Sequence, residues 1–423
     1  MTNTLKKLNP EFNHVLQSFS DLAVGSGIKI YLVGGAVRDL CLCRKTFDLD
    51  IVVEGDAIKF VHTFCERNKK KFKKHHVFGT ATIYFDDFHV DFVTARRETY
   101  AFSGALPKVK PASLKEDLFR RDFTINAMAI SLNKEDYGLL VDFYGGRKDL
   151  ENGLIRVLHE KSFMDDPTRI LRAVRFEQRF SFKIESVTLE LLHKAIMQEA
   201  FSFVNAHRLR DELISILKES KPYKYLVRLF RLKALFFINR SLKINKKDAL
   251  LFARLDKGIY FYEKEFEAHR KLEEYILYLT AILIKFPRKD AASFLERFGF
   301  KKGDKMRILS IYDNLISAKT LTKKTLPHKI FQFLNPFSFE SVVFFYAYYP
   351  DKEIRRHINF FLSNLSVVRL KLKGHDLKQM GFAPLTLYGK LFEKLLHAKM
   401  DKGFESIDDE IKEARAIFRK LSA

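Results

Sequence analysis

The chain has 423 residues, of which 47% are apolar, so it can bury a substantial core and is too apolar to be a disordered protein. Its 75 Lys and Arg against 52 Asp and Glu give a net charge of +23, which favours a polyanionic partner, and nucleic acid fits best. Three cysteines and no apolar run of about eighteen residues exclude a disulfide framework and a membrane span, so we expect a cytoplasmic protein with no membrane partner.

The chain begins with a pattern that predicts a helix, a strand, a glycine turn and a second strand. Helical periodicity covers residues 11–24, and an apolar run over residues 28–33 predicts the first strand. The strand ends at Gly34-Gly35, where a backbone without Cβ atoms can approach a phosphate closely and a short helix follows. A glycine pair alone is most often only a tight turn.

The second strand carries two acidic residues, Asp48 and Asp50. Residues two apart on a strand point to the same side, so both carboxylates lie together while Leu49 faces the core. Two oxygen ligands at one edge can hold one or two Mg²⁺ ions, as a nucleotidyl displacement requires. The Asp-x-Asp pattern alone is a weak signal, but with the glycine turn it predicts a site for a metal ion and a triphosphate.

The next segment predicts a helix and then a hairpin. An amphipathic helix is expected over residues 56–70, ending in a basic run that is more often a solvated face than a phosphate-binding patch. Residues 80–85 and 88–94 alternate apolar with polar and predict two hairpin strands. Asp91 on the second of them is either a third carboxylate beside the metal site or an exposed strand residue, and we favour the first.

A loop and a polar helix are expected next. Residues 95–113 contain a glycine, two prolines and several basic residues, which predicts a flexible loop over the site. Residues 114–130 are predicted to form a helix bearing Arg121, Asp122 and Asn126. Arginine suits a triphosphate and Asp or Asn can hydrogen-bond ribose hydroxyls, although by itself the segment is an ordinary charged helix.

The fold class changes near residue 150. Residues 142–150 predict a glycine turn that leads into a strand over residues 155–158 and closes the first domain. Beyond this point strand patterns fade and long helical patterns with few prolines take over. We therefore place the boundary between an α/β part and an all-α part there.

A second chemical constellation lies at the start of the first of these helices. Asp166 and Arg169 are three residues apart and therefore neighbours on a helix surface, with Arg172 and Arg175 continuing the series. An acceptor beside a donor can meet the Watson–Crick edge of a base, and this pair would favour C and A, which carry an exocyclic amine there. The alternative is an N-cap with an intrahelical ion pair.

The remaining segments are predicted to be helical and basic. A helix over residues 206–218 places Arg208 and Glu212 four apart, most simply a structural ion pair. From residue 221 onward only amphipathic helices rich in Lys, Phe and Leu are expected. Their basic faces could follow RNA phosphates, and a solvated surface is an equal alternative.

Several signatures in a fixed order resemble those of one known family. They read YLVGGAVRD with DLD, RRDFTINAMAI, DFYGGRKDL, DDPTRILRAVRF and HRLRDEL. Over about residues 28–220 the chain closely resembles the bacterial class II tRNA nucleotidyltransferase and poly(A) polymerase family. The resemblance implies an α+β protein with a polymerase-β-like nucleotidyltransferase head, a mixed sheet with helices, over residues 1–150. A helical neck would span residues 151–220, and an all-helical body and tail that bind tRNA would span residues 221–423.

The resemblance also implies roles for individual residues. Asp48 and Asp50 would hold Mg²⁺, with Asp91 as the third catalytic carboxylate. The nucleotide-binding residues would be Gly35, Arg38, Arg121, Asp122, Asn126, Asp166, Arg169, Arg172 and Arg175. Asp166 and Arg169 would read the base in place of a nucleic-acid template.

The expected activity is Mg²⁺-dependent addition of C and/or A residues from CTP and ATP to the 3′ end of tRNA, with release of pyrophosphate. Full CCA, CC-only and A-only addition share these motifs, and the sequence does not separate them. The alternatives are a poly(A) polymerase acting on general RNA and a non-catalytic RNA-binding relative. Retention of all the motif acids and arginines argues against the second alternative.

Overall fold

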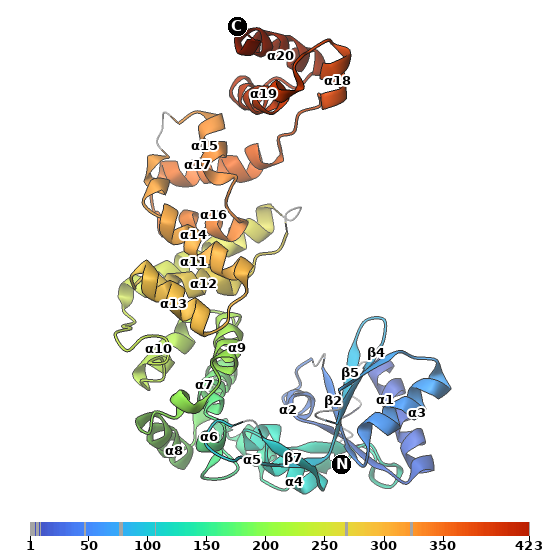
Figure 1. The fold of residues 1–423 in the computed structure, drawn as a ribbon. Helices are drawn as coiled ribbons and strands as arrows, with labels where there is room; N and C mark the ends of the chain where they lie inside the picture. The colour runs from blue at the N-terminus through green and yellow to red at the C-terminus, as the bar shows by residue number, and fades with distance from the viewer. Residues whose placement is uncertain are drawn as a thin grey trace. The chain divides into compact units, whose positions relative to one another are not determined.

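The protein forms two compact units. The structure, a computed structural model, describes residues 5, 8, 10–45, 48–75, 79–105, 107–266, 270–321 and 325–422. Unit 1 comprises Met1–Ile216 and Lys224–Leu242, and unit 2 comprises Leu217–Tyr223 and Lys243–Ala423. The large sheet lies in the N-terminal part, and helices predominate in the later part of the chain (Figure 1), so the predicted α+β class is confirmed. The predicted domain limits at residues 150 and 220 stay predictions.

A mixed sheet of seven strands forms the framework of unit 1. Its strand order is β3-β4-β5-β2-β1-β8-β9, and β2 runs parallel to β5 while the other neighbours pair antiparallel. The strands are β1 (Lys29–Val33), β2 (Leu49–Glu54), β3 (Phe72–His75), β4 (Thr80–Tyr84), β5 (His89–Thr94), β8 (Ala129–Ser131) and β9 (Leu140–Val141). The predicted strands over residues 28–33, 80–85 and 88–94 are therefore confirmed. The predicted second strand is β2, which carries Asp50, whereas Asp48 immediately precedes it.

Helices α1 (Pro10–Ser26) and α3 (Ala57–Asn68) pack together and against the sheet (Figure 1). The buried residues of α1 recur at helical spacing, and the Phe19 ring centroid lies 4.6 Å from that of Phe64 on α3 and 4.9 Å from that of Phe92 on β5. The Asp56 carboxylate accepts a hydrogen bond from the backbone N–H of Lys59 and caps α3. Both helices agree with the sequence prediction.

The strand residues whose side chains point to the other face of the sheet form a second apolar cluster. Tyr31, Val33 and Val52 pack with Leu114 and Leu118 of helix α4 (Leu114–Phe119). Because strand side chains alternate, Asp50 points to the same side as Val52. The functional side chains of the sheet therefore gather beside the cluster that α4 completes, where the short helix α2 (Gly35–Cys41) also begins.

The predicted helix over residues 114–130 is wrong beyond Phe119. After α4 the chain makes a turn, a 3-10 helix η3 (Thr124–Asn126) and strand β8, which pairs with β1. Residues 123–132 are buried along their whole length, so their apolar run carries no period that separates a helix from a buried strand. Pairing with β1 decides the outcome, and it leaves Arg120 and Arg121 in a turn.

Two further strand assignments depart from the sequence prediction. The segment expected to be a flexible loop forms a two-stranded antiparallel ribbon of β6 (Arg96–Thr99) and β7 (Lys108–Pro111). The basic run that follows α3 forms β3 at the edge of the sheet. Both are strands of charged, exposed residues, which lack the apolar alternation by which half-buried strands are recognised.

The rest of unit 1 is mainly helical. Helix α7 buries Ile170, Ala173 and Val174 on one stripe, as its sequence period predicts. The strand expected over residues 155–158 is shorter, because β10 pairs in parallel with β11 only over two residues. The elements are α5 (Gly146–Glu151), β10 (Leu154–Ile155), α6 (Ser162–Asp165), α7 (Thr168–Phe180), β11 (Lys183–Ile184), α8 (Ser186–Met197), α9 (Ala206–Leu217) and α10 (Tyr223–Arg231).

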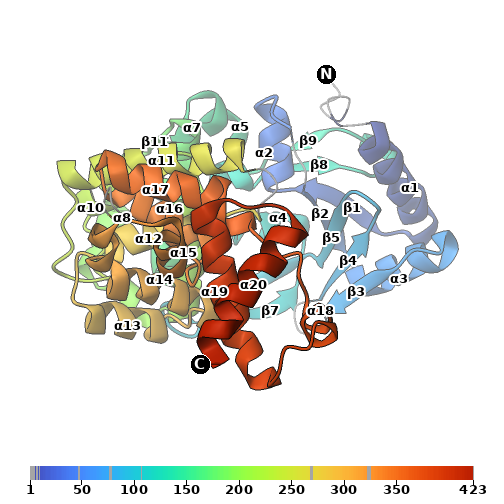
Figure 2. The same cartoon turned by 90° about the horizontal axis from the view of Figure 1, so that it is seen from above.

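Unit 2 is helical throughout its described residues. Its helices are α11 (Lys246–Glu265), α12 (Glu274–Leu283), α13 (Arg288–Arg297), α14 (Lys302–Asn314), α15 (Pro327–Leu334), α16 (Phe339–Tyr348), α17 (Lys352–Ser363), α18 (Gly374–Gln379), α19 (Tyr388–Lys402) and α20 (Ile407–Ser422). Nearly every residue of α12 is buried, which makes it a central helix of the unit. Helices α19 and α20 lie side by side (Figure 2) over a small core of their own. Within the described ranges, the helices are too short or too polar to cross a lipid bilayer.

Candidate active site

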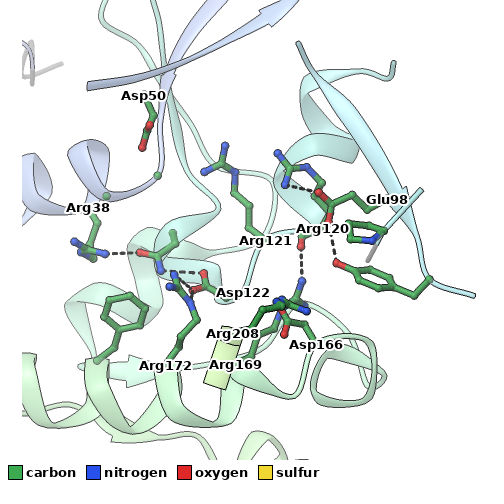
Figure 3. A pocket seen from close by; sticks show the side chains of 16 residues that line it. Arg38, Asp50, Glu98, Arg120, Arg121, Asp122, Asp166, Arg169, Arg172 and Arg208 are labelled. Carbon is green, nitrogen blue, oxygen red and sulfur yellow. Dashed lines mark hydrogen bonds and ion pairs between the residues drawn. The ribbon is translucent and has the colours of Figure 1, made fainter. Parts of the chain in front are cut away.

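Most of the predicted nucleotide-binding residues line one cavity of unit 1, with a volume of about 450 Å³ (Figure 3). The sheet contributes the glycine turn and Asp50, and the turn after α4 contributes arginines. The junction of α6 and α7, α7 itself and α9 contribute the opposite wall. The lining residues are Gly34, Gly35, Arg38, Asp50, Glu98, Tyr100, Pro107, Arg120, Arg121, Asp122, Asn126, Asp166, Arg169, Arg172, Phe176 and Arg208. Segments more than a hundred residues apart in sequence thus form a single site.

The acidic edge of the cavity is formed by β2 and β5. Asp50 and Asp91 are direct partners in the parallel register of these strands, and Asp48 immediately precedes β2. The Asp91 carboxylate accepts a hydrogen bond from the Thr82 hydroxyl at 2.5 Å. The structure therefore brings Asp91 beside Asp50, although neither Asp48 nor Asp91 is among the residues that line the cavity.

The electrostatics of this edge suit a cation. Asp50 is exposed to the cavity, yet desolvation by the surrounding protein raises its pKa, and repulsion from Asp91 and Asp48 raises it further against the lowering effect of Arg121. Among the described residues no group of three or more His, Cys, Asp or Glu is placed to hold a metal ion by itself. Two carboxylates are enough for Mg²⁺, which takes its other ligands from water and from substrate phosphates.

The glycine turn fits tightly against an arginine. Gly34 has a φ of +70°, a conformation that residues with a Cβ rarely adopt. A Cβ there would lie 2.8 Å from Nη1 of Arg121 and 3.9 Å from a carboxylate oxygen of Asp50. The absence of a Cβ on Gly34 therefore leaves room for the Arg121 guanidinium beside the turn. Figure 3 labels both Arg121 and Asp50 among the residues that line the cavity.

A buried carboxylate that the sequence analysis did not single out positions the two arginines after α4. Asp117 is fully buried, and it accepts from Arg120 at 2.7 Å and from Arg121 at 3.1 Å. Burial alone would raise its pKa, but Arg121 and Arg120 outweigh burial, so the pKa of Asp117 is lowered and the carboxylate stays charged. The two guanidinium groups are therefore held in place before any ligand arrives.

A continuous hydrogen-bond network runs through the cavity wall. Arg38 donates to the Asn126 side chain at 2.6 Å, and the Asn126 amide donates to Asp122 at 2.9 Å. Asp122 in turn accepts two hydrogen bonds from Arg172, at 2.7 and 2.8 Å, and Arg172 donates to Glu212 at 3.1 Å. The network joins α2, the turn after α4, α7 and α9.

Asp122 is the central member of this network. Its burial would raise its pKa, yet Arg172 and the hydrogen bond from Asn126 lower the pKa to about 2. At the other end, burial lowers the pKa of Arg38, whose guanidinium lies over the rings of Phe176 and Phe180 at 5.3 and 4.9 Å. Asp122 and Asn126 are thus bonded to protein groups in this structure, and their predicted contact with ribose stays a prediction.

The predicted base-reading pair lies at the junction of α6 and α7. The sequence pattern placed Asp166 on the surface of a helix, but in the structure Asp166 lies between α6 and α7. Its carboxylate accepts hydrogen bonds from the backbone N–H and the hydroxyl of Thr168, the first residue of α7. Its other carboxylate oxygen accepts from Arg208 at 2.6 Å. Arg169 donates to the Ser162 hydroxyl at 2.6 Å and to the Arg120 carbonyl at 2.7 Å.

These contacts leave capacity for a base. A carboxylate offers about four acceptor positions and a guanidinium has five N–H groups, so both Asp166 and Arg169 can make further hydrogen bonds. Figure 3 shows the two side chains together at one wall of the cavity, next to Arg208. Their side chains are oriented by protein partners, which suits a fixed recognition surface.

The ion pair predicted between Arg208 and Glu212 does not form, because each residue has another partner. Arg208 pairs with Asp166, while Glu212 pairs with Arg172 and Arg175, so the predicted structural pair of Arg208 and Glu212 is wrong. Helical spacing allowed that pair, but in the folded chain Arg208 lies 2.6 Å from Asp166, and Glu212 lies 3.1 Å from Arg172 and 3.3 Å from Arg175. Arg175 is not among the cavity-lining residues, and its predicted proximity to the nucleotide phosphates stays a prediction.

Other lining residues were missed by the sequence analysis. Glu98 and Tyr100 come from the β6–β7 segment, and the Tyr100 hydroxyl donates to Glu98 at 2.8 Å. Arg120 also donates to Glu98, at 3.0 Å. No local pattern marks Glu98 or Tyr100, because the segment reads as a polar loop until its pairing as a ribbon is known.

The fold and the cavity together define a nucleotidyltransferase head followed by helices. The sequence profile described as the Poly A polymerase head domain matches residues 30–156. An A-adding tRNA nucleotidyltransferase from Geobacter sulfurreducens is 33% identical over 394 residues, 91% of this chain and 44% of that protein. One from Halalkalibacterium halodurans is 32% identical over 415 residues, 96% of this chain and 92% of that protein.

A solved structure agrees with the relatives. The complex of a CCA-adding enzyme with ATP is 30% identical and has a TM-score of 0.77, covering 98% of this chain and 98% of that chain. This chain spans less than half the length of the Geobacter sulfurreducens relative, but almost all of the Halalkalibacterium halodurans one. The chain belongs to the tRNA nucleotidyltransferase and poly(A) polymerase family.

Proposed function

We propose that this chain adds A and/or C residues from ATP and CTP to the 3′ end of tRNA and releases pyrophosphate. The observation that carries the proposal is the convergence, in one cavity, of Asp50, Arg38 and Arg121 with the pair Asp166 and Arg169. The first group suits a triphosphate and its metal ions, and the second suits a base edge. The activities named for the relatives support the same reading.

The residues of the acidic edge have the donor set for Mg²⁺. Asp48 and Asp50 would hold the ions, with Asp91 next to Asp50, and the raised pKa of Asp50 reflects a carboxylate group that gains from a cation. Divalent ions at such a site polarise phosphate oxygens and favour the deprotonated form of an attacking hydroxyl. Arg121 and Arg38 bind and orient the triphosphate, because their guanidinium groups face the glycine turn.

Selection of the base follows from the opposite wall. The Asp166 carboxylate accepts a hydrogen bond from an exocyclic amine, and Arg169 donates to a ring nitrogen or carbonyl. Cytosine N4 and adenine N6 are amines, whereas uracil and guanine place a carbonyl oxygen against the carboxylate. The wall therefore favours CTP and ATP over UTP and GTP without a nucleic-acid template.

The nucleotides that the protein adds, A alone, CC or the whole CCA end, can be distinguished by experiment. Addition of A is favoured by relatives that match nine-tenths of this chain and are named A-adding, while the CC-adding relative matches 51% of it. Purified protein is incubated with three tRNAs, which lack the terminal A, the terminal CA or the whole CCA end, and with CTP or ATP alone. Incorporation of ATP only into the first tRNA indicates A addition, and incorporation of CTP into the others indicates CC or CCA addition.

The two alternatives give different results in the same assay. A long A tail on an unrelated RNA indicates a poly(A) polymerase. Failure to bind Mg²⁺-nucleotide or to extend any RNA indicates a non-catalytic RNA-binding relative. The cytoplasmic location expected from the sequence stays a prediction.

The central test removes the acidic edge. Asp50→Asn is expected to lower the rate of nucleotide addition at least about a thousandfold, because the metal-bound charge is lost where the phosphoryl group reacts. Binding of tRNA and the free energy of unfolding are expected to change little. Asp87→Asn, which replaces an exposed acid in the hairpin turn of the same sheet, serves as the matched control. A rate for Asp50→Asn within tenfold of the wild type contradicts the proposed mechanism.

A further inference from the structure

A second cavity, with a volume of about 580 Å³, adjoins the nucleotide cavity in unit 1. The two cavities share four lining residues, which are Glu98, Tyr100, Arg120 and Arg169. The remaining lining residues of the second cavity are Arg97, Lys115, Glu116, Phe119, Tyr144, His159 and Asp165. The mechanism described above uses none of these seven.

One wall of the second cavity is aromatic. The Phe119 ring centroid lies 5.6 Å from that of Tyr144 and 5.2 Å from that of His159. Phe119 is 43% exposed, so part of its ring is accessible from the cavity side. The Tyr144 hydroxyl donates to the Lys115 carbonyl at 2.8 Å, which holds the ring against α4. The protein therefore maintains an exposed aromatic surface beside the nucleotide site.

Cationic side chains border this surface. Lys115 lies four residues before Phe119, hence on the same face of α4, and both are exposed. Arg97, on β6, is also exposed and lies 3.8 Å from Glu116. His159 is uncharged at neutral pH, because burial together with Arg169 and Lys161 lowers its pKa to about 4. An aromatic surface bordered by Lys and Arg is the usual arrangement for binding unpaired nucleotides.

We propose that the second cavity binds a base of the unpaired 3′-terminal nucleotides of the RNA primer, stacked on Phe119 and Tyr144. This inference rests on the proposed function, because the primer end has to lie beside the incoming nucleotide with which it reacts. Arg169 and Arg120 line both cavities and so bring the two binding sites together. Lys115 pairs with the backbone phosphate of the stacked nucleotide.

The choice of a polymer over a free nucleotide follows from the residues that are present. In the nucleotide cavity Arg38, Arg121 and the edge that carries Asp50 serve the triphosphate, whereas the second cavity has neither Asp50 nor the glycine turn among its lining residues. Of its three acids, Glu98 and Glu116 are each paired with an arginine, and Asp165 lies 3.9 Å from His159. The second cavity therefore offers a stacking surface and one or two contacts to phosphate. Such a site suits an RNA strand, which the protein also contacts elsewhere along its length.

The test compares Phe119→Leu with Phe119→Tyr. Leucine keeps the apolar contact and removes the ring, whereas tyrosine keeps the ring. Phe119→Leu is expected to raise KM for the tRNA primer about tenfold, equivalent to about 1.4 kcal/mol, and to leave KM for the nucleotide within twofold of the wild type. Phe119→Tyr stays near the wild type. Phe236→Leu is the matched control, because Phe236 in unit 1 is 44% exposed and lies outside both cavities.

A primer with an abasic ribose, placed in turn at each unpaired 3′ position, identifies the stacked base. At one position the abasic ribose is expected to raise KM of the wild-type enzyme for the primer about tenfold. With Phe119→Leu the same abasic primer is expected to cause no further rise in KM, because in a double-mutant cycle the two changes remove the same contact. Additive effects at every position overturn the proposal. So does an unchanged KM for the primer in Phe119→Leu, and so does a rise in KM for the nucleotide alone, which would assign the cavity to a free nucleotide.

A binding measurement separates this inference from the proposed function. Anisotropy of labelled tRNA is recorded with the Asp50→Asn protein, alone and combined with Phe119→Leu, so that no chemistry intervenes. If the wild type adds no nucleotide, the proposed function fails. In that case the subsite is still supported if adding Phe119→Leu weakens the affinity for intact tRNA tenfold and leaves the affinity for the abasic tRNA unchanged. Equal weakening for both RNAs overturns it.

Discussion

Replacement of Asp122 by Asn tests the network that joins the glycine-turn side of the cavity to α7. Asp122 is 8% exposed and accepts hydrogen bonds from Arg172 and Asn126. The variant keeps the shape of the side chain and removes its charge. It therefore leaves the buried Arg172 guanidinium with Glu212 as its remaining acidic partner in the network.

The size of the effect follows from the pKa of the carboxyl group. The pKa of Asp122 falls from 3.8 to about 2 on folding, so the folded state favours the charged form by about 2 kcal/mol at neutral pH. Because the folded-state pKa is depressed, this stabilisation is fully present well above pH 3.8 and is lost as the pH falls towards 2. About half of it remains near pH 3. The free energy of unfolding of Asp122→Asn should therefore be about 2 kcal/mol lower than that of the wild type at pH 7, and the difference should be smaller near pH 3.

The assay has to separate the two compact units, because a single unfolding transition cannot be assumed for them. Hydrogen exchange followed by mass spectrometry reports the opening free energy of peptides from α7 and from unit 2 separately. Loss of protection is expected in α7 at pH 7. Glu340→Gln is the control, since Glu340 is a fully buried acid of unit 2 that pairs with Arg270 and Arg307. A destabilisation of α7 by Asp122→Asn that is the same at pH 7 and pH 3 would refute the reasoning.

Two further substitutions test the walls of the cavity. Gly34→Ala should raise KM for the triphosphate about tenfold and lower stability by about 1 kcal/mol, because its Cβ meets Arg121 at a φ of +70°. Gly25→Ala, with nothing near its Cβ, is the control, and an unchanged KM for Gly34→Ala contradicts the fit. Arg208→Ala should lower the preference in kcat/KM for CTP and ATP over UTP and GTP about tenfold, because Asp166 loses a charged hydrogen bond. An equal loss for all four nucleotides would make Arg208 merely structural.

The sequence predicted the parts of the fold that carry a clear period. The buried residues of helices α1 and α7 repeat at helical spacing, strands β4 and β5 alternate, and β1 and β2 are short apolar runs on either side of the glycine turn. The prediction for the segment after Phe119 was wrong because the segment has no clear period: it is buried throughout. Its strand β8 pairs with β1, which lies about a hundred residues earlier in the chain. The prediction missed the charged β6–β7 ribbon because its strands lack the apolar alternation by which strands are recognised in a sequence.

The candidate site divides in the same way. Order and chemistry of the residues alone were enough to single out Asp50, Arg121, Asp166 and Arg169, because each lies in a short motif whose residue types suit one task. The sequence did not decide the partner of Arg208, which could have been Glu212 on its own helix or Asp166 before α7, and the structure pairs it with Asp166. Spacing along a helix limits the possible partners, and distance and burial in the folded chain select among them.

The sequence by itself determined the class of chemistry, because acids two apart on a strand and a glycine turn have few other uses together. Only the tertiary structure decided that β5 places Asp91 against Asp50, that Asp117 holds both arginines of the turn, and that a second, aromatic cavity adjoins the first. Each of these depends on contacts between distant segments. Such contacts are fixed by the burial of the whole core and leave no mark in any one stretch of residues.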